Sequence, residues 1–208
     1  MTTQKIIEGI TAFVRDNICS RITLKLPDDA RNDGRYNIKM VTPAAFPLFV
    51  PAKDRMPPNV EAPIPSIAVQ LLEGSDSLSD GRRKLKLRLC LSTWNPGKHP
   101  GETMFPTRDT SALGGYHYNT DPESETYSRN IDGWKDLYNL QDIALAELEG
   151  AEFMAGVRID MDEPITYGPF TEEGVIWDYY PYWSGWIAFS VICGVPLKKT
   201  ANIRNLLN

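Results

Sequence analysis

Histidines are the first residues to test for chemistry, because imidazole is the side chain most often used in acid and base catalysis and in metal binding. The chain has two of them, His99 and His117. Asp109 or Asp121 would add a carboxylate ligand, but the histidines are 18 residues apart and no cysteine lies nearby. Structural zinc sites use shorter spacings. We therefore expect exposed loop histidines and no metal site.

Nucleophilic catalysis and phosphate binding each require a local pattern that this sequence lacks. No serine lies in a GxSxG turn, and no histidine lies outside the stretch that carries His99 and His117. Gly114 and Gly115 are followed by turn formers rather than by a helix, and there is no phosphate-binding GxxxxGK motif. We expect neither nucleophilic catalysis nor nucleotide hydrolysis.

Two pairs of carboxylates are close in sequence, Asp160 with Asp162 and Glu172 with Glu173. Such pairs can act as acid and base in glycosidases, and they can bind a divalent cation. They are also common on the solvated strands and loops of acidic proteins, which is the interpretation we favour. The sequence thus predicts no catalytic residue, no cofactor and no enzymatic activity.

Basic residues gather in one short stretch of the otherwise acidic chain. As a charged strand they would discourage stray pairing with other chains. As a functional patch they would complement the acidic surface of a neighbouring subunit. We therefore take them as candidate interface residues: Arg82, Arg83, Lys84, Lys86 and Arg88.

Six aromatic residues occupy twelve positions between Val175 and Trp186. A turn that contains Pro181 cannot bury every ring, so about half of them should remain on the surface as a contact site. The flanking residues Glu172, Glu173 and Asp178 are acidic, which favours protein over nucleic acid as the partner. The candidate interface residues here are Trp177, Tyr179, Tyr180, Tyr182 and Trp183.

Composition indicates an ordinary globular chain. Its 208 residues are 42% hydrophobic and 24% charged, with a net charge of −5, which argues against a general nucleic-acid binder. The three cysteines are widely spaced and suggest buried thiols rather than disulfides. No apolar run is long enough for a signal sequence or a membrane span, so we expect a protein made and kept in the cytoplasm.

Hydrophobic periodicity then gives the elements that must position these residues. Four leucines alternate with polar residues from Arg83 to Trp94, and apolar residues occupy both faces from Trp186 to Val195, as in a central or covered strand. We predict one α+β domain over residues 1–208, with a mixed or antiparallel sheet and two main helices packed on one face. The predicted segments begin with an opening amphipathic helix capped by Thr2 or Thr3, followed by strands near 22–26 and 36–41 and by a proline-rich extended excursion at 42–65. Strands at 67–71 and 83–94 then flank a polar turn at 73–81, and a long arm follows at 96–130. The last predicted segments are a helix from 134 to a C-cap at Gly150 and strands at 157–161 and 186–195.

Several of these segments together resemble the tail terminator, or tail-completion, proteins of long-tailed bacteriophages and of phage-tail-like bacteriocins. The resemblance extends over the whole chain. It rests on the opening helix, on the strand Pro65 to Gln70 with the following Glu73-Gly74-Ser75-Asp76, on Ser92 to Gly97, and on the helix that begins Asp132-Gly133-Trp134-Lys135-Asp136-Leu137.

The resemblance implies a small structural subunit with no catalytic residues. Such a subunit forms a ring, expected to be a hexamer, that caps the head-proximal end of the tail tube, ends its polymerisation and offers a docking face to the neck. The implied partners are other copies of the chain, the tail tube protein, and neck, connector or sheath proteins. DNA would pass through the ring without specific binding, and the protein would move from the host cytoplasm into the virion.

Two alternatives stay open. One is another neck or head-tail joining subunit, which shares the same assembly physics. The other is a carbohydrate-binding or hydrolytic module of the virion, suggested by the aromatic run and the clustered carboxylates. The proline-rich excursion and the arm lengthen the chain beyond a minimal terminator, and in a contractile tail they would contact sheath or neck.

Overall fold

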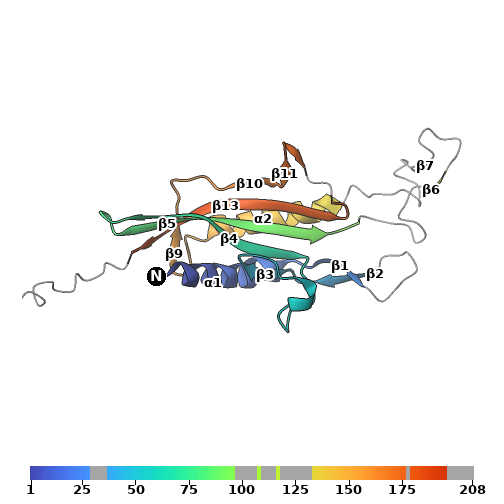
Figure 1. Ribbon diagram of the computed structural model, residues 1–208, viewed down its shortest axis with the longest axis horizontal. Helices are drawn as coiled ribbons and strands as arrows, with labels where there is room; N and C mark the ends of the chain where they lie inside the picture. Colours follow the sequence, from blue (N-terminus) through green and yellow to red (C-terminus); the bar gives the residue numbers. More distant parts are fainter. Residues whose placement is uncertain (29–36, 97–106, 109–115, 118–132, 177–178, 196–208) are drawn as a thin grey trace, which may run out of the picture.

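The strand with the four alternating leucines lies inside the main sheet and organises it. The computed structural model describes residues 1–28, 37–96, 107–108, 116–117, 133–176 and 179–195. Strand β5 (Arg82–Trp94) pairs antiparallel with β13 (Tyr182–Gly194) over 13 residues, from Arg82 opposite Gly194 to Trp94 opposite Tyr182. On its other side β5 pairs with β4 (Ser66–Ser77), and these three long strands form the centre of Figure 1.

Shorter strands complete a curled, mixed sheet of seven strands. Beyond β4 lies β3 (Ala44–Pro47), the one parallel neighbour in this sheet, while β10 (Thr166–Pro169) and β9 (Val157–Ile159) both pair with β13. Strand β8 (Phe153–Met154) follows β9. The expectation of an α+β domain with a mixed sheet is confirmed, and the strand predicted from Trp186 is indeed central.

Three small hairpins lie outside the main sheet. Strand β1 (Leu24–Asp28) pairs with β2 (Asn37–Val41). The sequence predicted strands near both positions but not their pairing. Strand β11 (Thr171–Glu172) pairs with β12 (Val175–Ile176). Within the predicted arm, β6 (Thr107–Arg108) pairs with β7 (Tyr116–His117), and most of the rest of that arm lies outside the described residues.

Both predicted helices are present. Helix α1 (Thr3–Phe13) is capped at its N-terminus by Thr2, whose hydroxyl accepts a hydrogen bond from the backbone N–H of Lys5. The helix continues as a π-helical turn over Val14–Ile18. A 3₁₀ turn over Cys19–Arg21 ends the helical segment. Helix α2 (Trp134–Gly150) ends at Gly150, with Ala151 extended behind it, so Gly150 is the last helical residue and not a left-handed cap.

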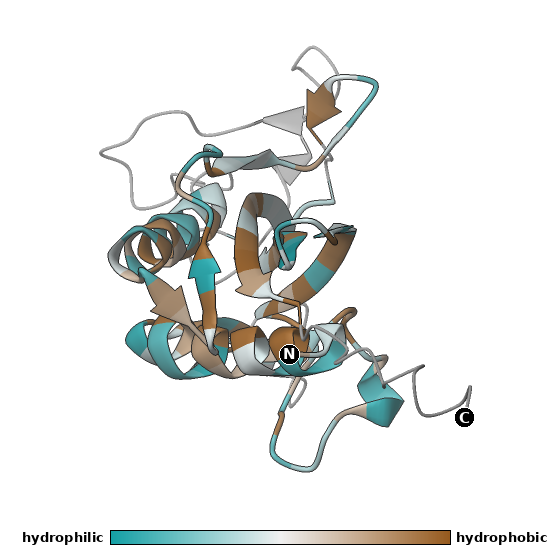
Figure 2. Cartoon of the chain, turned by 90° about the vertical axis from the view of Figure 1, so that its left-hand side faces the viewer, coloured by the Kyte–Doolittle hydropathy of each residue, from teal (hydrophilic) through white to brown (hydrophobic). Residues whose placement is uncertain are grey.

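The core forms where the apolar stripes of the helices meet the leucine side of the sheet. Viewed along the strands in Figure 2, hydrophobic segments gather at the centre of the molecule. Because strand side chains alternate, the leucines of β5 line up with the apolar residues of β13 across the ladder, for example Leu87 with Phe189. The fully buried members include Ile6, Ile10, Leu87, Leu89, Leu140 and Ile187.

The structure differs from the sequence prediction in three places. Ala44–Pro47 form a strand within the proline-rich segment, which is possible because an edge strand uses only one side of its backbone and the prolines stand at its limits. The turn predicted at 73–81 is shorter, because β4 continues to Ser77 past an irregularity after Leu71. Trp134, which shares a helical stripe with the buried Leu137 and Leu148, is nevertheless exposed. No helix among the described residues is long and apolar enough to cross a membrane.

The leucine ladder generates a stability prediction. Leu87→Ala removes a fully buried side chain from the middle of the core, and we expect it to lower the free energy of unfolding by about 2–5 kcal/mol. The matched control is Leu78→Ala, a leucine exposed at the turn after β4, which should change it by less than about 0.5 kcal/mol. Urea titrations followed by far-UV circular dichroism measure both. Equal losses would contradict this assignment of the core.

Candidate functional site

The predicted basic patch divides between the two sides of the sheet. Three of the cations, Lys84, Lys86 and Arg88, alternate with the buried leucines of β5 and therefore project from the opposite, polar side of the sheet. Arg83 projects from the same side as the leucines. Arg82 begins the strand and is exposed. The five cations are thus close in sequence without forming one continuous surface.

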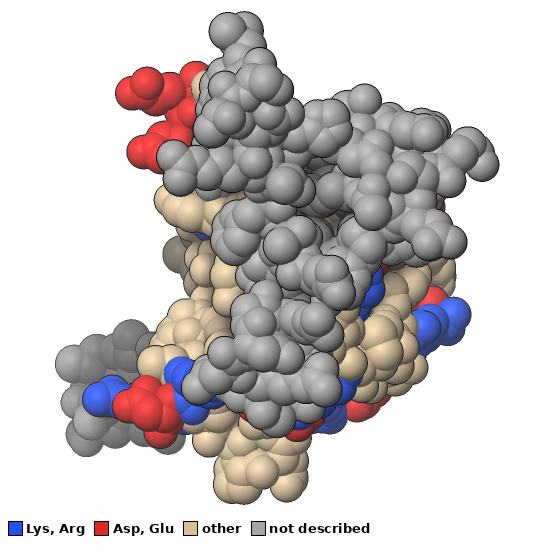
Figure 3. Space-filling view, turned by 90° about the vertical axis from the view of Figure 1, so that its right-hand side faces the viewer, with Lys and Arg blue, Asp and Glu red and all other residues tan. Residues whose placement is uncertain are grey.

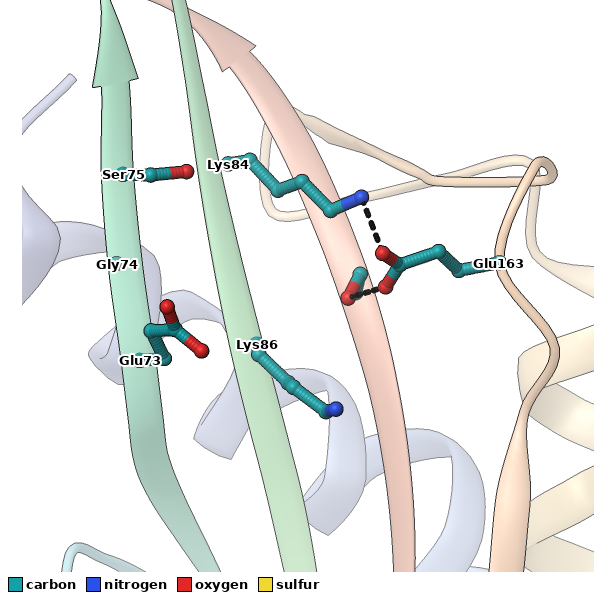
Figure 4. A pocket seen from close by; sticks show the side chains of 7 residues that line it. Glu73, Gly74, Ser75, Lys84, Lys86 and Glu163 are labelled. Atoms are coloured by element: carbon teal, nitrogen blue, oxygen red, sulfur yellow. Dashed lines mark hydrogen bonds and ion pairs between the residues drawn. The ribbon is translucent and has the colours of Figure 1, made fainter.

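Lys84 of β5 forms ion pairs with two carboxylates, which lie beyond the neighbouring strand β13. Its Nζ lies 2.7 Å from Asp160 Oδ2 and 2.6 Å from Glu163 Oε1, and Ser190 Oγ donates to Glu163 Oε2 at 2.6 Å. Figure 4 shows Lys84 and Glu163 meeting at the rim of a cavity of about 270 Å³, which Lys86, Glu73, Ser75 and Ser190 also line. The three charged groups form one polar cluster, which we call the Lys84 cluster.

Mutual hydrogen bonding shifts the titration of the Lys84 cluster. The hydrogen bond from Lys84 lowers the pKa of Asp160 and, with a second one from Ser190, that of Glu163. The same carboxylates raise the pKa of Lys84. Asp160 is buried, so its charge depends on this partner, and the backbone N–H of Asp162 also donates to it at 3.2 Å. The two members of the predicted carboxylate pair therefore differ, because Asp160 is buried and paired with Lys84, whereas Asp162 is exposed.

Other members of the basic patch also have partners within the chain. Arg83 makes a two-pronged ion pair with Asp76 across β4 and β5, with both contacts at 2.7 Å, and it lowers the pKa of that carboxyl. Arg88 donates to Gln70 and lies 5.6 Å from the ring centre of Phe170. By contrast, Lys86 makes no ion pair or hydrogen bond with the described residues. The patch therefore presents fewer unmatched charges than its sequence suggests, and its role as an interface stays a prediction.

The predicted aromatic patch divides in a similar way. Trp183 Nε1 donates to the carbonyl of Asn95 at 2.9 Å, and the Tyr180 hydroxyl donates to the carbonyl of Pro96 at 3.0 Å. These two rings meet edge to face. Tyr179 and Tyr182 are exposed, whereas Trp177 lies outside the described residues. Part of the run thus secures the C-terminal end of β5, whereas Tyr179 and Tyr182 remain exposed, and the role of the run as an interface stays a prediction.

Asn95 is a central residue that sequence analysis did not identify. Its side chain is buried, donates to Asp136 of α2 at 2.7 Å, and accepts from Lys25 of β1 at 2.9 Å. Its backbone N–H donates to the carbonyl of Pro181. One asparagine therefore joins β1, β5, α2 and the turn before β13. Only its position directly after a strand and before a proline could have drawn attention to it.

The same junction brings together the two ends of the long arm. A Cβ atom on Gly133, the residue before α2, would lie 2.0 Å from the carbonyl oxygen of Asn95 and 2.6 Å from Trp183 Nε1. Asn95 and Gly133, which flank the predicted arm at 96–130, are therefore adjacent in space. The arm is an insertion that leaves and re-enters the domain at one point.

Metal ligands do not converge in the part of the chain that the structure describes. Within those residues, no group of three or more His, Cys, Asp or Glu side chains is arranged to hold a metal ion. Burial raises the pKa of the Cys19 thiol to about 12, so it stays protonated. Glu172 and Glu173 lie exposed on the hairpin of β11 and β12. His99 falls outside the described residues, and His117 lies in β7.

Comparison with known proteins provides no relative from which a role could be transferred. No model of a known protein family matches the chain, and no curated protein sequence is significantly similar to it. Functional inference therefore depends on the surfaces described above.

The Lys84 cluster predicts a pH dependence of stability. Because the folded pKa values of Asp160 and Glu163 are lowered, their contribution is present above the ordinary carboxyl pKa of about 4 and is lost as the pH falls through the folded values. Lys84→Met should therefore destabilise the fold at pH 7, and its deficit relative to wild type should shrink below about pH 4. Urea titrations over this pH range measure the difference. Lys86→Met, on the same strand and side, is the control and should have little effect at any pH.

The junction predicts that the two glycines at the ends of α2 differ. Gly133→Ala forces a Cβ against backbone and should destabilise the fold by about 1–3 kcal/mol. Gly150→Ala meets no atom within 4 Å and should be neutral or stabilising by up to about 1 kcal/mol. Thermal unfolding measures the stability of both variants. If Gly133→Ala were as stable as wild type, the close contact between Gly133 and Asn95 would be excluded.

Proposed function

We propose that this chain is a structural subunit of a bacteriophage tail, or of a phage-tail-like particle, that caps the head-proximal end of the tail tube as a ring. The observation that carries the proposal is the placement of large apolar side chains on turns and segment ends. Leu78 is 81% exposed, Met161 71%, Val175 69% and Phe49 67%. Side chains this exposed contribute little to the stability of the monomer, and their burial would favour assembly.

Charge distribution supports contacts between unlike surfaces. Exposed Glu172 and Glu173 share a hairpin with exposed Val175 and Ile176, and acidic side chains stand out at the top of Figure 3, the side where β11 lies in Figure 1. Exposed cations such as Arg82 lie on a different strand. A cyclic ring needs two different patches on each subunit, because each copy contacts the next through a heterologous interface.

The proposed ring assigns a role to each part of the chain. The two helices cover one face of the sheet and provide the rigid core, while the hairpins and the arm contact other copies, the tail tube and the neck or sheath. Subunits would be made in the host cytoplasm and incorporated into the virion. DNA would pass through the opening of the ring without a specific site, in keeping with the acidic net charge of the chain.

Negative-stain imaging of the purified protein tests this proposal. The protein should form rings, alone or when mixed with tail tubes assembled from the tube protein encoded in the same genome, and rings should appear at one end of the tubes. Tubes grown with the protein present should be shorter than tubes grown without it. Particles that neither form rings nor bind tube ends, and tubes of unchanged length, would refute the assignment. Binding to purified neck proteins but not to tubes would favour the neck alternative.

A further inference from the structure

Strand β4 has an open edge over its second half. Strand β3 pairs with β4 only as far as Pro47, which lies opposite Val69, and the backbone N–H of Leu48 then donates to the Val69 carbonyl at 2.8 Å. Beyond this point, over residues 70–77, β5 is the one strand that pairs with β4 among the described residues (Figure 4). Because the backbone groups of a strand point alternately to its two sides, part of the N–H and C=O groups of this stretch have no partner in the sheet.

Exposed apolar side chains lie where this edge opens. They belong to two residues that directly follow β3 and to two residues of β4: Leu48, Phe49, Leu71 and Leu72. The hydrogen bond from Leu48 to Val69 places both pairs at the same point of the sheet. The irregularity after Leu71 also leaves Leu72 without a partner on β5. We call these four side chains, with the backbone of residues 70–77, the β4 edge.

A strained turn keeps two of these side chains in solvent. The backbone N–H of Phe49 donates to the carbonyl of Pro47 at 2.8 Å, which closes a γ-turn around Leu48, and the φ of Leu48 is +67°. This form of γ-turn is rare, and a positive φ is unfavourable for a residue with a Cβ. Backbone strain of this kind is concentrated at functional sites. The turn is therefore evidence for a role of the β4 edge that is independent of its exposed apolar side chains.

An open strand edge beside apolar side chains is suited to binding an extended segment. The backbone groups of the edge supply hydrogen bonds, and the side chains supply apolar contacts. Residues 196–208 have the matching composition, with large aliphatic side chains at Leu197, Ile203, Leu206 and Leu207. They also carry three cations and no acidic residue, whereas the whole chain has a net charge of −5. The basic segment is thus attracted to an acidic copy, and the β4 edge provides the specific contacts.

The place where this segment begins favours a neighbouring copy over the same chain. The backbone N–H of Val195 donates to the carbonyl of Gly81 at 2.7 Å, so the segment starts at the end of the sheet, beside the turn between β4 and β5. Val195 precedes Pro196, and a residue before proline favours extended backbone over a reversal of the chain. The chain direction at Val195 therefore points beyond the end of its own sheet. Thirteen extended residues span at most about 45 Å, which is enough to cross the surface of another copy.

We propose that residues 196–208 of one copy add as an extended strand to the β4 edge of the next copy, with their aliphatic side chains against Leu48, Phe49, Leu71 and Leu72. Such a contact is heterologous, because each copy donates one segment and accepts another, and it closes into a ring when the rotation between copies allows. The inference rests on the proposed function, because it names an interface between copies in the proposed ring.

A cysteine pair tests the contact directly. In the variant Leu72→Cys/Leu206→Cys, mild oxidation should give covalent dimers, trimers and larger species on a non-reducing gel. The control Asp142→Cys/Leu206→Cys, whose first cysteine is at an exposed position of α2, should give no such series. Wild type accounts for the native Cys19, Cys90 and Cys193. A cross-link within one chain would overturn the inference by placing the segment on its own β4 edge. Efficient dimers of Leu72→Cys alone would overturn it by pairing two edges.

A second measurement uses single substitutions on each side of the contact. Leu72→Asp and Ile203→Asp should each weaken self-association in sedimentation equilibrium roughly 10-fold, because each puts a charge into an apolar contact. Leu72→Met keeps the side chain apolar and should associate like wild type. Leu72 is exposed in the monomer, so a urea titration of Leu72→Asp should match wild type and show that its fold is intact. If both aspartate variants associate like wild type, the inference fails.

The outcomes are distinguishable from those of the proposed function. When the cysteine pair gives no series beyond its control and wild type still caps tail tubes, the inference fails and the proposed function stands. A covalent series without binding to tubes would support the contact between copies and refute the tail assignment.

Discussion

The pairing of β5 with β13 over 13 residues is the constraint on which the rest of the structure depends. It joins segments almost 100 residues apart and aligns two apolar rows on one side of the sheet. The helices bury these rows, and the strands that flank the pair extend the sheet at both edges. Because the pairing is long, it also sets the distance between the two ends of the domain. The turn between β4 and β5 lies at one end of this ladder, and the junction around Asn95 lies at the other.

Polar residues on the other side of the ladder stabilise the arrangement through specific partners. Lys84 reaches across β13 to Asp160 and Glu163, and Asn95 connects the end of β5 to helix α2. These contacts change the role expected of the basic stretch, because a cation paired with a buried carboxylate is not available to bind another subunit. Surfaces suited to assembly are instead the exposed apolar tips, among which Leu78 is the clearest. The proposed function builds on that distinction.

Much of the fold could be predicted from periodicity, because alternation in β5 and helical spacing in α1 and α2 are local properties of the chain. Strand β3 was missed because prolines argue against regular structure, yet Pro47 fits at the end of an edge strand. Asn95 was missed for another reason: a single asparagine has no pattern, and its partners come from distant elements. The candidate interface was predicted only as charged and aromatic stretches, without the internal contacts that occupy some of their members.

By itself, the sequence determined the α+β class, the long hairpin and central strand, and the two helices, because local propensity and the burial of apolar faces specify these elements. Tertiary structure alone decided which polar residues are matched inside the chain and which remain for partners. It placed Lys84 beside Asp160, Trp183 against Asn95, and Leu78 in solvent at the turn between β4 and β5. The physical reason is that ion pairs, hydrogen bonds and cavities depend on the distances between segments that are remote in sequence, and only the folded sheet sets those distances.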